Sequence, residues 1–101
     1  AIVESYIDNP DFDVATFARE MCMSRTLLFT KLKALTGQTP NDFILSLRLK
    51  KATEKLRNDP NALIADIAFD YGFSNPSYFI RCFKNAYDIT PAAYRRKYAN
   101  Y

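Results

Sequence analysis

The chain has 101 residues, 49% of them hydrophobic and 25% charged, which is the balance of one globular domain. Histidine is absent and there are only two glycines, so we expect no enzyme, no metal site and no bound cofactor. No apolar run approaches the ~20 residues of a membrane span, so we expect no membrane contact by this domain. Cys22 and Cys82 lack a CxxC spacing and are interpreted as reduced, buried thiols.

The charge is unevenly distributed along the chain. Residues 1–24 carry five acidic and one basic side chain, whereas residues 25–101 carry six acidic and 13 basic side chains. A basic body favours a polyanionic partner, although a merely solvated surface explains the charge equally well. Because the chain lacks an initial methionine, we expect it to be a piece of a longer protein.

Apolar residues recur at helical spacing throughout, which predicts an all-α fold of about seven helices. A first short helix over residues 1–9 ends at Asn9 and Pro10, and its apolar stripe is Ile2, Val3, Tyr6 and Ile7. A second helix begins after Asp13, which is a favourable N-cap. Its predicted buried face consists of Val14, Phe17, Ala18 and Met21.

The third and fourth helices are predicted from their caps and stop residues. Ser24 caps a helix that Gly37 ends, and its inward residues are expected to be Leu28, Leu32 and Leu35. Thr39 caps the longest helix, residues 40–57, which has Pro40 at its first position. Its two apolar stripes are Leu45, Leu49, Ala52 and Leu56, and beside them Phe43 and Leu47.

Three further helices complete the prediction. The fifth ends at Gly72, and its apolar face consists of Ile64, Ile67, Ala68 and Tyr71. Asn75 caps the sixth, and its inward residues are expected to be Phe79, Cys82, Phe83 and Ala86. Thr90 and Pro91 open the seventh helix, which runs through Tyr98.

The most informative feature is an internal duplication. Residues 14–43 resemble residues 64–94, first at an offset of 50 and, after one inserted residue, at an offset of 51. Each copy is a short helix, a tight turn and a longer helix, which is the helix-turn-helix arrangement. A duplicated helix pair can also be plain helical packing, but two copies are too few for a solenoid.

The second helix of each copy carries a polar stripe on its outward side. The stripe residues are Thr26, Thr30 and Lys33 in the first copy and Ser77, Arg81 and Lys84 in the second. Arginine and hydroxyl groups suit base edges in the major groove, and lysines further along the helix suit phosphate. One such stripe is more often a solvated face, but its repetition favours DNA binding. Phe29 and Ile80, beside the stripes, fit groove contact and helix packing equally well.

Two stretches of sequence resemble a known family. Residues 64–95, "IADIAFDYGFSNPSYFIRCFKNAYDITPAAYR", follow a long pattern of IA, then GF, then a serine-led helix with FK, and finally TP-x-x-YR. The first half, "FAREMCMSRTLLFTKLKALTGQTPNDFILSLRLKKATEKL", fits the same pattern and includes "RLKKA". Through these stretches nearly the whole chain resembles the DNA-binding domain of the AraC/XylS family of transcription regulators.

The resemblance implies a single DNA-binding domain over residues 1–101. It would consist of two homeodomain-like helix-turn-helix units, about residues 1–39 and about 61–101, joined by the linker helix of about residues 40–57. Two recognition helices, about residues 25–35 and 76–87, would enter successive major grooves of double-stranded operator DNA. The base-contacting residues that the resemblance implies are Arg25, Thr26, Phe29, Thr30, Pro76, Ser77, Ile80 and Arg81. The phosphate-contacting residues that it implies are Lys33, Asn75, Lys84 and Arg95.

Two positions depart from the family pattern. Asp88 stands where the family often has glycine, so the turn before Thr90 is a place where the backbone can differ. Thr30 is smaller than the polar readers that are common at its position. Whether the first unit reads bases or only phosphates therefore stays open.

The stretch "KLKALTGQTPNDFI" also resembles the C-terminal domains of Bacteroides-type hybrid two-component regulators. In these proteins a membrane-spanning sensor, a kinase and a receiver precede the DNA-binding piece. This resemblance implies a cytoplasmic output domain attached to the rest of a larger regulator chain, with RNA polymerase as a further partner. The alternative function is a helical protein-interaction module that docks a receiver domain or RNA polymerase.

Overall fold

The structure is a computed structural model that describes residues 12–99. Within these residues the chain forms helices and no strand, which confirms the all-α fold class. The helices are α2 (Val14–Glu20), α3 (Arg25–Thr36), α4 (Pro40–Asn58), α5 (Ile64–Asp70), α6 (Pro76–Tyr87) and α7 (Pro91–Tyr98). They correspond to the second through seventh predicted helices. The predicted helix of residues 1–9 lies outside the described residues.

Local capping explains where most of these helices begin. The side chains of Asp13, Ser24, Thr39 and Thr90 each accept a hydrogen bond from a backbone N–H three residues later. The Asn75 side chain accepts two such bonds at the start of α6. The four predicted caps, Asp13, Ser24, Thr39 and Asn75, are therefore confirmed, and Thr90 caps α7 in the same way.

The duplication extends to individual backbone hydrogen bonds. After α2, the N–H groups of Cys22 and Met23 donate to carbonyls of α2, and Gly72 and Phe73 make the same bonds after α5 at an offset of 50. At the ends of the longer helices, the N–H of Gly37 donates to Lys33 and that of Asp88 donates to Lys84, at an offset of 51. These repeated hydrogen bonds show that the two helix-turn-helix units have matching backbone geometry.

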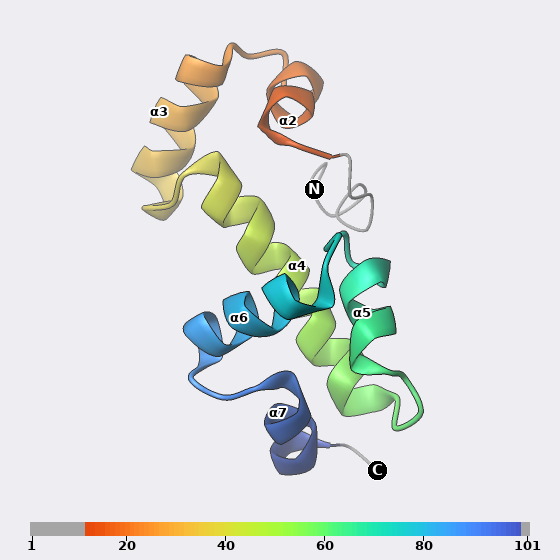
Figure 1. The fold of residues 1–101 in the computed structure, drawn as a ribbon. Helices are drawn as coiled ribbons and strands as arrows, with labels where there is room; N and C mark the ends of the chain where they lie inside the picture. Colours follow the sequence, from red (N-terminus) through yellow and green to blue (C-terminus); the bar gives the residue numbers. More distant parts are fainter. Residues whose placement is uncertain (1–11, 100–101) are drawn as a thin grey trace.

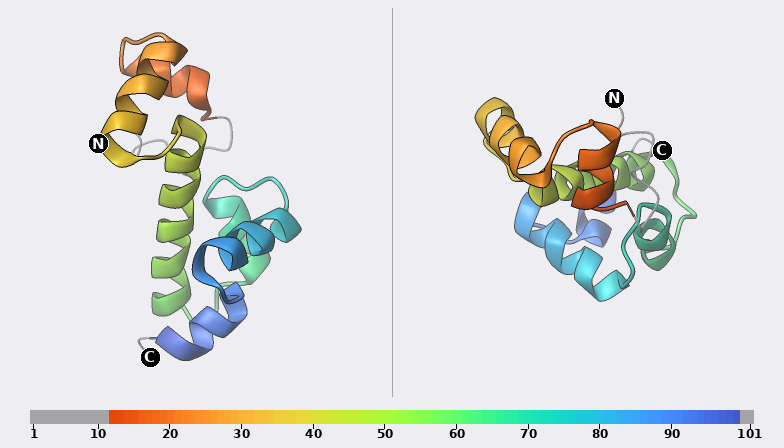
Figure 2. Two further views of the ribbon diagram at one scale, coloured as in Figure 1. Left: turned by 90° about the vertical axis from the view of Figure 1, so that its left-hand side faces the viewer. Right: turned by 90° about the horizontal axis from the view of Figure 1, so that it is seen from above.

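The long helix α4 is the spine on which both units pack (Figure 1). The first unit, α2 and α3, packs at the N-terminal end of α4, and the second unit, α5, α6 and α7, packs along its C-terminal half. Figure 2 shows that the molecule is elongated along α4, and its extents are 42 × 23 × 22 Å. The predicted linker helix is thus a shared structural element.

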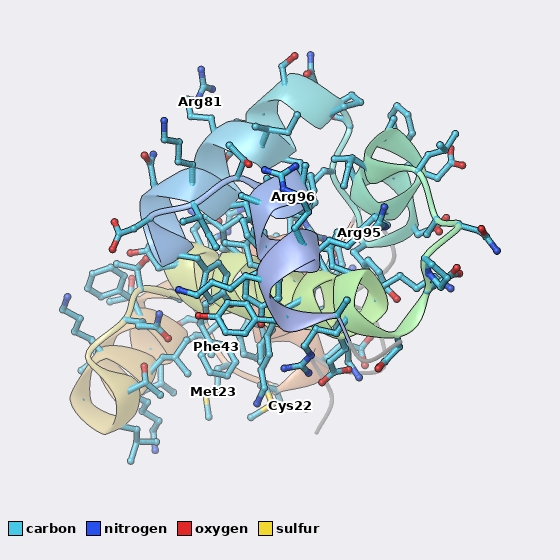
Figure 3. All side chains as sticks on the ribbon, turned by 90° about the horizontal axis from the view of Figure 1, so that it is seen from below. Cys22, Met23, Phe43, Arg81, Arg95 and Arg96 are labelled. Carbon is cyan, nitrogen blue, oxygen red and sulfur yellow. The ribbon has the colours of Figure 1, made fainter. Side chains whose placement is uncertain are left out.

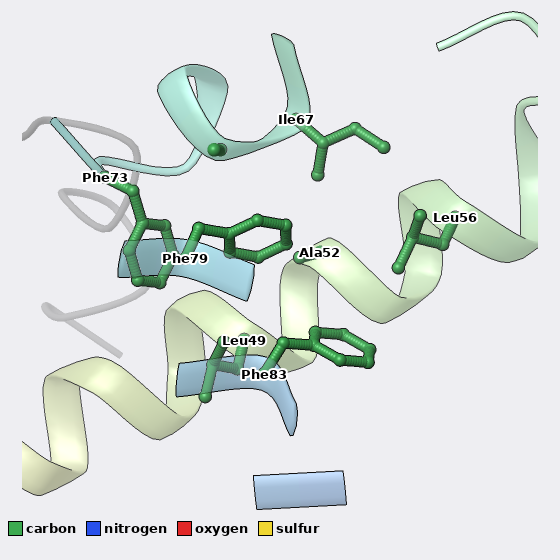
Figure 4. Close-up of a cluster of buried hydrophobic side chains, with 8 residues drawn as sticks. Leu49, Ala52, Leu56, Ile67, Phe73, Phe79 and Phe83 are labelled. Atoms are coloured by element: carbon green, nitrogen blue, oxygen red, sulfur yellow. The ribbon is translucent and has the colours of Figure 1, made fainter. Parts of the chain in front are cut away.

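Each unit has its own hydrophobic core. The buried residues of the first unit are Phe12, Phe17, Ala18, Leu28 and, from α4, Ile44. Those of the second unit are Leu49, Ala52 and Leu56 from α4, together with Ile67, Ala68, Phe73, Phe79 and Phe83 (Figure 4). The two cores lie at successive positions along α4, so the predicted apolar stripes of that helix serve different units.

Three residues on the predicted inward faces of helices are exposed. Leu35 is 83% exposed, Met21 is 38% exposed, and Ala86 is also exposed. Leu35 and Ala86 occupy equivalent positions in the last turns of α3 and α6, at an offset of 51. Helical periodicity places both on the inward stripe, but the structure leaves both side chains exposed.

The prediction of two buried cysteines is wrong for Cys22. Cys22 is exposed and Cys82 is half-buried, and both are free thiols. Cys22 follows α2 with a φ of 56°, the left-handed conformation that its counterpart Gly72 adopts with a φ of 91°. The turn directs this side chain away from the core.

Within residues 12–99, no helix is both long enough and apolar enough to cross a lipid bilayer.

Candidate nucleic-acid interface

The longer helix of each helix-turn-helix unit is free to face a ligand on its outward side. In Figure 1, α3 and α6 both lie to the left of α4 and at different heights along it. Leu28 on α3 and Phe79 and Phe83 on α6 are buried and anchor the inner sides of these helices. The opposite sides carry the residues that the sequence predicted to contact DNA.

In the second unit, the predicted base-contacting residues after Pro76 are exposed along α6. Ser77, Ile80 and Arg81 all have exposed side chains, and Lys84 is exposed one turn further along. Pro76 is half-buried at the first helical position. In Figure 3, Arg81 projects outward from α6. The structure therefore brings these residues together on one accessible helix face.

In the first unit, the predicted contact residues are also exposed along α3. Arg25, Thr26, Phe29, Thr30 and Lys33 all have exposed side chains. The Thr30 hydroxyl donates a hydrogen bond to the backbone carbonyl of Thr26 at 3.0 Å. Because that donor is engaged within α3, Thr30 offers a partner chiefly an acceptor and a methyl group. This helix face is accessible but has few strong donors at its centre.

Phe29 and Ile80 are exposed, by 48% and 37% respectively. Packing of these side chains against a neighbouring helix would have covered them. Contact with a thymine methyl group in the major groove requires an accessible apolar side chain, which both residues provide.

Two of the four predicted phosphate contacts have other roles in the structure. The Asn75 oxygen caps α6, which leaves its amide NH₂ as a donor. The Arg95 guanidinium donates to the backbone carbonyl of Ala62 at 2.6 Å and ties α7 to the loop before α5. Figure 3 shows Arg95 pointing from α7 toward the α5 side, away from Arg81. Arg95 is thus separated from the stripe on α6.

Charge is divided between the helices of each unit. The two longer helices, α3 and α6, contain arginine and lysine but no acidic side chain. The acidic residues of these helix pairs lie on the shorter helices, Glu20 on α2 and Asp66 and Asp70 on α5. Helices with only cationic charge on their exposed faces are suited to a polyanion.

Sequence reasoning missed one residue of this surface. Tyr78 lies on α6 beside the stripe, and the Arg81 Cζ atom lies 5.4 Å from the centroid of its ring. The only signal for this contact in the sequence is the spacing of three residues, which places side chains together on a helix.

Comparison with known proteins assigns the family. A helix-turn-helix domain family matches residues 17–97. Regulatory protein SoxS of Escherichia coli K12 is 31% identical over 97 residues, which cover 96% of this chain and 89% of SoxS. The chain belongs to the AraC/XylS family of transcription regulators, as a helix-turn-helix DNA-binding domain. Both the expected family and the expected function class are therefore confirmed.

Two further relatives place this AraC-type domain in context. The DNA-binding domain of AdpA, solved in complex with a target DNA, superposes with a TM-score of 0.84 at 28% identity, covering 93% of this chain and 83% of that chain. Histidine kinase P4 of Formosa agariphila is 42% identical over 98 residues, which cover 97% of this chain. The chain spans only 7% of that kinase. AraC-type domains thus occur in chains of very different length.

Proposed function

We propose that this AraC-type domain reads double-stranded operator DNA with α3 and α6 in successive major grooves, and that α6 carries most of the specificity. The observation that supports it best is the repeated exposed face, cationic and free of acidic side chains, on both longer helices. The proposed base contacts are Arg25, Thr26, Phe29 and Thr30 from α3, and Pro76, Ser77, Ile80 and Arg81 from α6.

Arg81 is the principal reader in this proposal. Its planar guanidinium can donate two hydrogen bonds to the O6 and N7 atoms of guanine, which no other proposed contact on α6 can do. On α3 the equivalent position holds Thr30, whose hydroxyl is engaged with its own helix. Arg25 is the one guanidinium on α3, and it stands at the first position of that helix.

The phosphate contacts position the domain on the duplex. Lys33 and Lys84 lie toward the C-terminal ends of α3 and α6, beyond the base-facing positions. Asn75 adds its amide NH₂ at the start of α6. The bond of Arg95 to the Ala62 carbonyl holds its guanidinium at the loop before α5, away from the stripe on α6, so we rank it last in this set.

The separation of the two recognition helices favours a bent duplex. Recognition helices on one face of straight DNA stand about 34 Å apart. The molecule is 42 Å long, and α7 lies beyond α6 at the end opposite to α3 (Figure 1). The two helices are therefore closer together than the ends of the molecule, and we expect the DNA to bend to meet both.

The domain is further proposed to be the cytoplasmic output piece of a longer regulator. The match to less than a tenth of a protein named as a histidine kinase supports a two-component setting. In that setting the chain is one domain, divided into its two units near residues 39 and 61. This domain would have no catalytic activity of its own. RNA polymerase and the preceding part of the regulator chain would be its protein partners.

The decisive experiment starts from duplexes that the purified domain selects from a random library. Dissociation constants for the preferred and a scrambled duplex are then measured at two salt concentrations, and the preferred duplex is footprinted. We expect two protected patches about 10 bp apart and affinity that falls steeply with salt. Little affinity at either salt concentration would favour the protein-interaction module instead.

Arg81→Ala tests the assignment of the reader. We expect it to weaken binding to the preferred duplex by about 1–3 kcal/mol and to relax the preference at one base pair. Arg96→Ala, which removes an exposed arginine from α7, is the matched control and should leave the base preference unchanged. An equal loss on the preferred and the scrambled duplex would show that Arg81 contacts the DNA backbone.

A further inference from the structure

We propose that Tyr78 positions the Arg81 guanidinium and thereby determines specificity in the second unit. This inference rests on the proposed function, because it assumes that Arg81 reads a base. Tyr78 lies outside the predicted set of DNA-contacting residues. In this proposal it is a positioning residue, whose effect on base recognition passes through Arg81.

The first observation is the contact itself. The Arg81 Cζ atom lies 5.4 Å from the centroid of the Tyr78 ring, which is within the range of a cation–π interaction. Both residues are exposed on α6, so the pair is accessible to DNA. An arginine side chain otherwise loses considerable rotamer entropy when it becomes fixed at a base. Resting on a ring before binding reduces that loss.

The second observation is that the ring is itself held in place. Its centroid lies 6.2 Å from that of Phe73, which is buried and in turn packs on Phe79 at 4.9 Å. The backbone N–H of Tyr78 donates to the capping side chain of Asn75. The neighbouring Cys82 thiol raises the pKa of the Tyr78 hydroxyl and burial raises it further, whereas the charge of Arg81 lowers it. The ring is thus supported from the core by Phe73, and its backbone is fixed at the helix start by Asn75.

The third observation is that Arg81 has no competing acidic partner. Among the described residues, an ion pair within 4 Å joins Lys55 and Asp59. Arg81 forms no ion pair with any of these residues. The carboxylates of Asp70 and Asp88 therefore do not hold the guanidinium. The Arg81 guanidinium instead contacts the Tyr78 ring.

The first unit lacks this device at every matching position. At an offset of 51, Tyr78 and Arg81 correspond to Leu27 and Thr30, and at an offset of 50 Phe73 corresponds to Met23. Leu27 is 43% exposed, as exposed as Tyr78 at 44%, but it has no ring face for a cation. The positioned arginine is therefore particular to the second unit.

The test combines Tyr78→Leu and Tyr78→Phe with Arg81→Ala. For each protein, dissociation constants are measured on the preferred duplex and on a duplex with the Arg81-dependent base pair replaced. We expect Tyr78→Leu to reduce the discrimination between the two duplexes by about two- to fivefold. Tyr78→Phe keeps the ring and should retain the discrimination. In the Arg81→Ala background, Tyr78→Leu should have no further effect on it.

Tyr87→Leu is the matched control. Tyr87 lies on the same helix and packs on Phe83 at 4.7 Å, without a contact to Arg81. It should lower stability without changing the discrimination. A further fall in affinity for both duplexes when Tyr78→Leu is added to Arg81→Ala would overturn the inference, since it would show an effect of Tyr78 that does not pass through Arg81. Unchanged discrimination in Tyr78→Leu, while Arg81→Ala abolishes it, would overturn the inference and leave the proposed function intact. If the wild-type domain shows no Arg81-dependent preference, the proposed reader itself is wrong.

Discussion

Among residues 12–99, eight buried residues form a core rich in aromatic rings in the second unit, whereas the core of the first unit has five buried residues. Six residues of the second core are completely inaccessible to solvent, and the largest of them are Leu56, Ile67, Phe79 and Phe83. The first unit has the same hydrogen-bonded framework but leaves Met21, Leu27 and Leu35 exposed. One backbone plan therefore supports two different levels of packing.

The same contrast holds on the outward faces. The second unit presents an arginine that rests on a supported tyrosine, and the first unit presents a threonine bonded to its own helix. A tightly packed core and the proposed reader, resting on Tyr78, occur together in the second unit. The comparison teaches that duplication preserved the backbone framework of two helix-turn-helix units, while the tighter packing and the arginine that rests on a tyrosine belong to the second unit.

The largest effect is expected from removing the central ring of the second core. Phe83→Ala should lower the free energy of unfolding by about 3–5 kcal/mol, because it leaves a cavity among buried side chains. The equivalent change in the first unit, Leu32→Ala, should cost less, since Leu32 is only half-buried. Urea denaturation followed by circular dichroism measures both. Equal losses would refute the difference in packing between the units.

The next effect tests whether both units touch the DNA backbone. Lys33→Ala and Lys84→Ala should each reduce the slope of log affinity against log salt by about 1, for all sequences alike. The slope is measured from binding isotherms at salt concentrations between about 50 and 200 mM. Lys97→Ala on α7 is the control and should leave the slope unchanged. A change with Lys84→Ala alone would mean that the first unit does not engage phosphate.

A smaller effect is expected at the turn of the first unit. Cys22→Gly should stabilise the domain by about 0.5–1 kcal/mol, because it removes a side chain from a left-handed backbone conformation at a modest entropic cost. Asp88→Gly, also left-handed with a φ of 66°, should gain less, since aspartate tolerates this conformation better. Thermal unfolding of the two variants compares them. A destabilised Cys22→Gly protein would contradict this account of the turn.

The smallest effect is expected at the uncovered end of α3. Leu35→Lys should change the free energy of unfolding by less than about 0.5 kcal/mol, because the side chain is 83% exposed. Chemical denaturation at neutral pH is sufficient to measure it. A loss comparable to that of Leu32→Ala would show that the last turn of α3 is covered in solution.

The sequence by itself determined the framework of this protein. Caps such as Ser24 and Asn75, proline at first helical positions and the stop at Gly37 act through bonds within three or four residues, so they are readable in the chain. The duplication and the outward stripes follow from the same local periodicity. Asp88 occupies the position that is equivalent to Gly37 in the first unit. Its left-handed φ matches that of Gly37, so the turn is preserved although the residue is not glycine.

The tertiary structure alone decided which stripe residues are covered and what the long side chains contact. Leu28 and Leu35 lie on one side of α3, but only Leu28 meets a neighbouring element, and periodicity cannot reveal where a neighbour ends. Arg95 bonds to a carbonyl 33 residues away, a partner that no local pattern specifies. Phe73 lies beside the Tyr78 ring that Arg81 contacts, and this neighbour is brought there by the packing of α5 against α6. Local hydrogen bonds are encoded over a few residues, whereas burial and side-chain pairing depend on all the elements that surround a position.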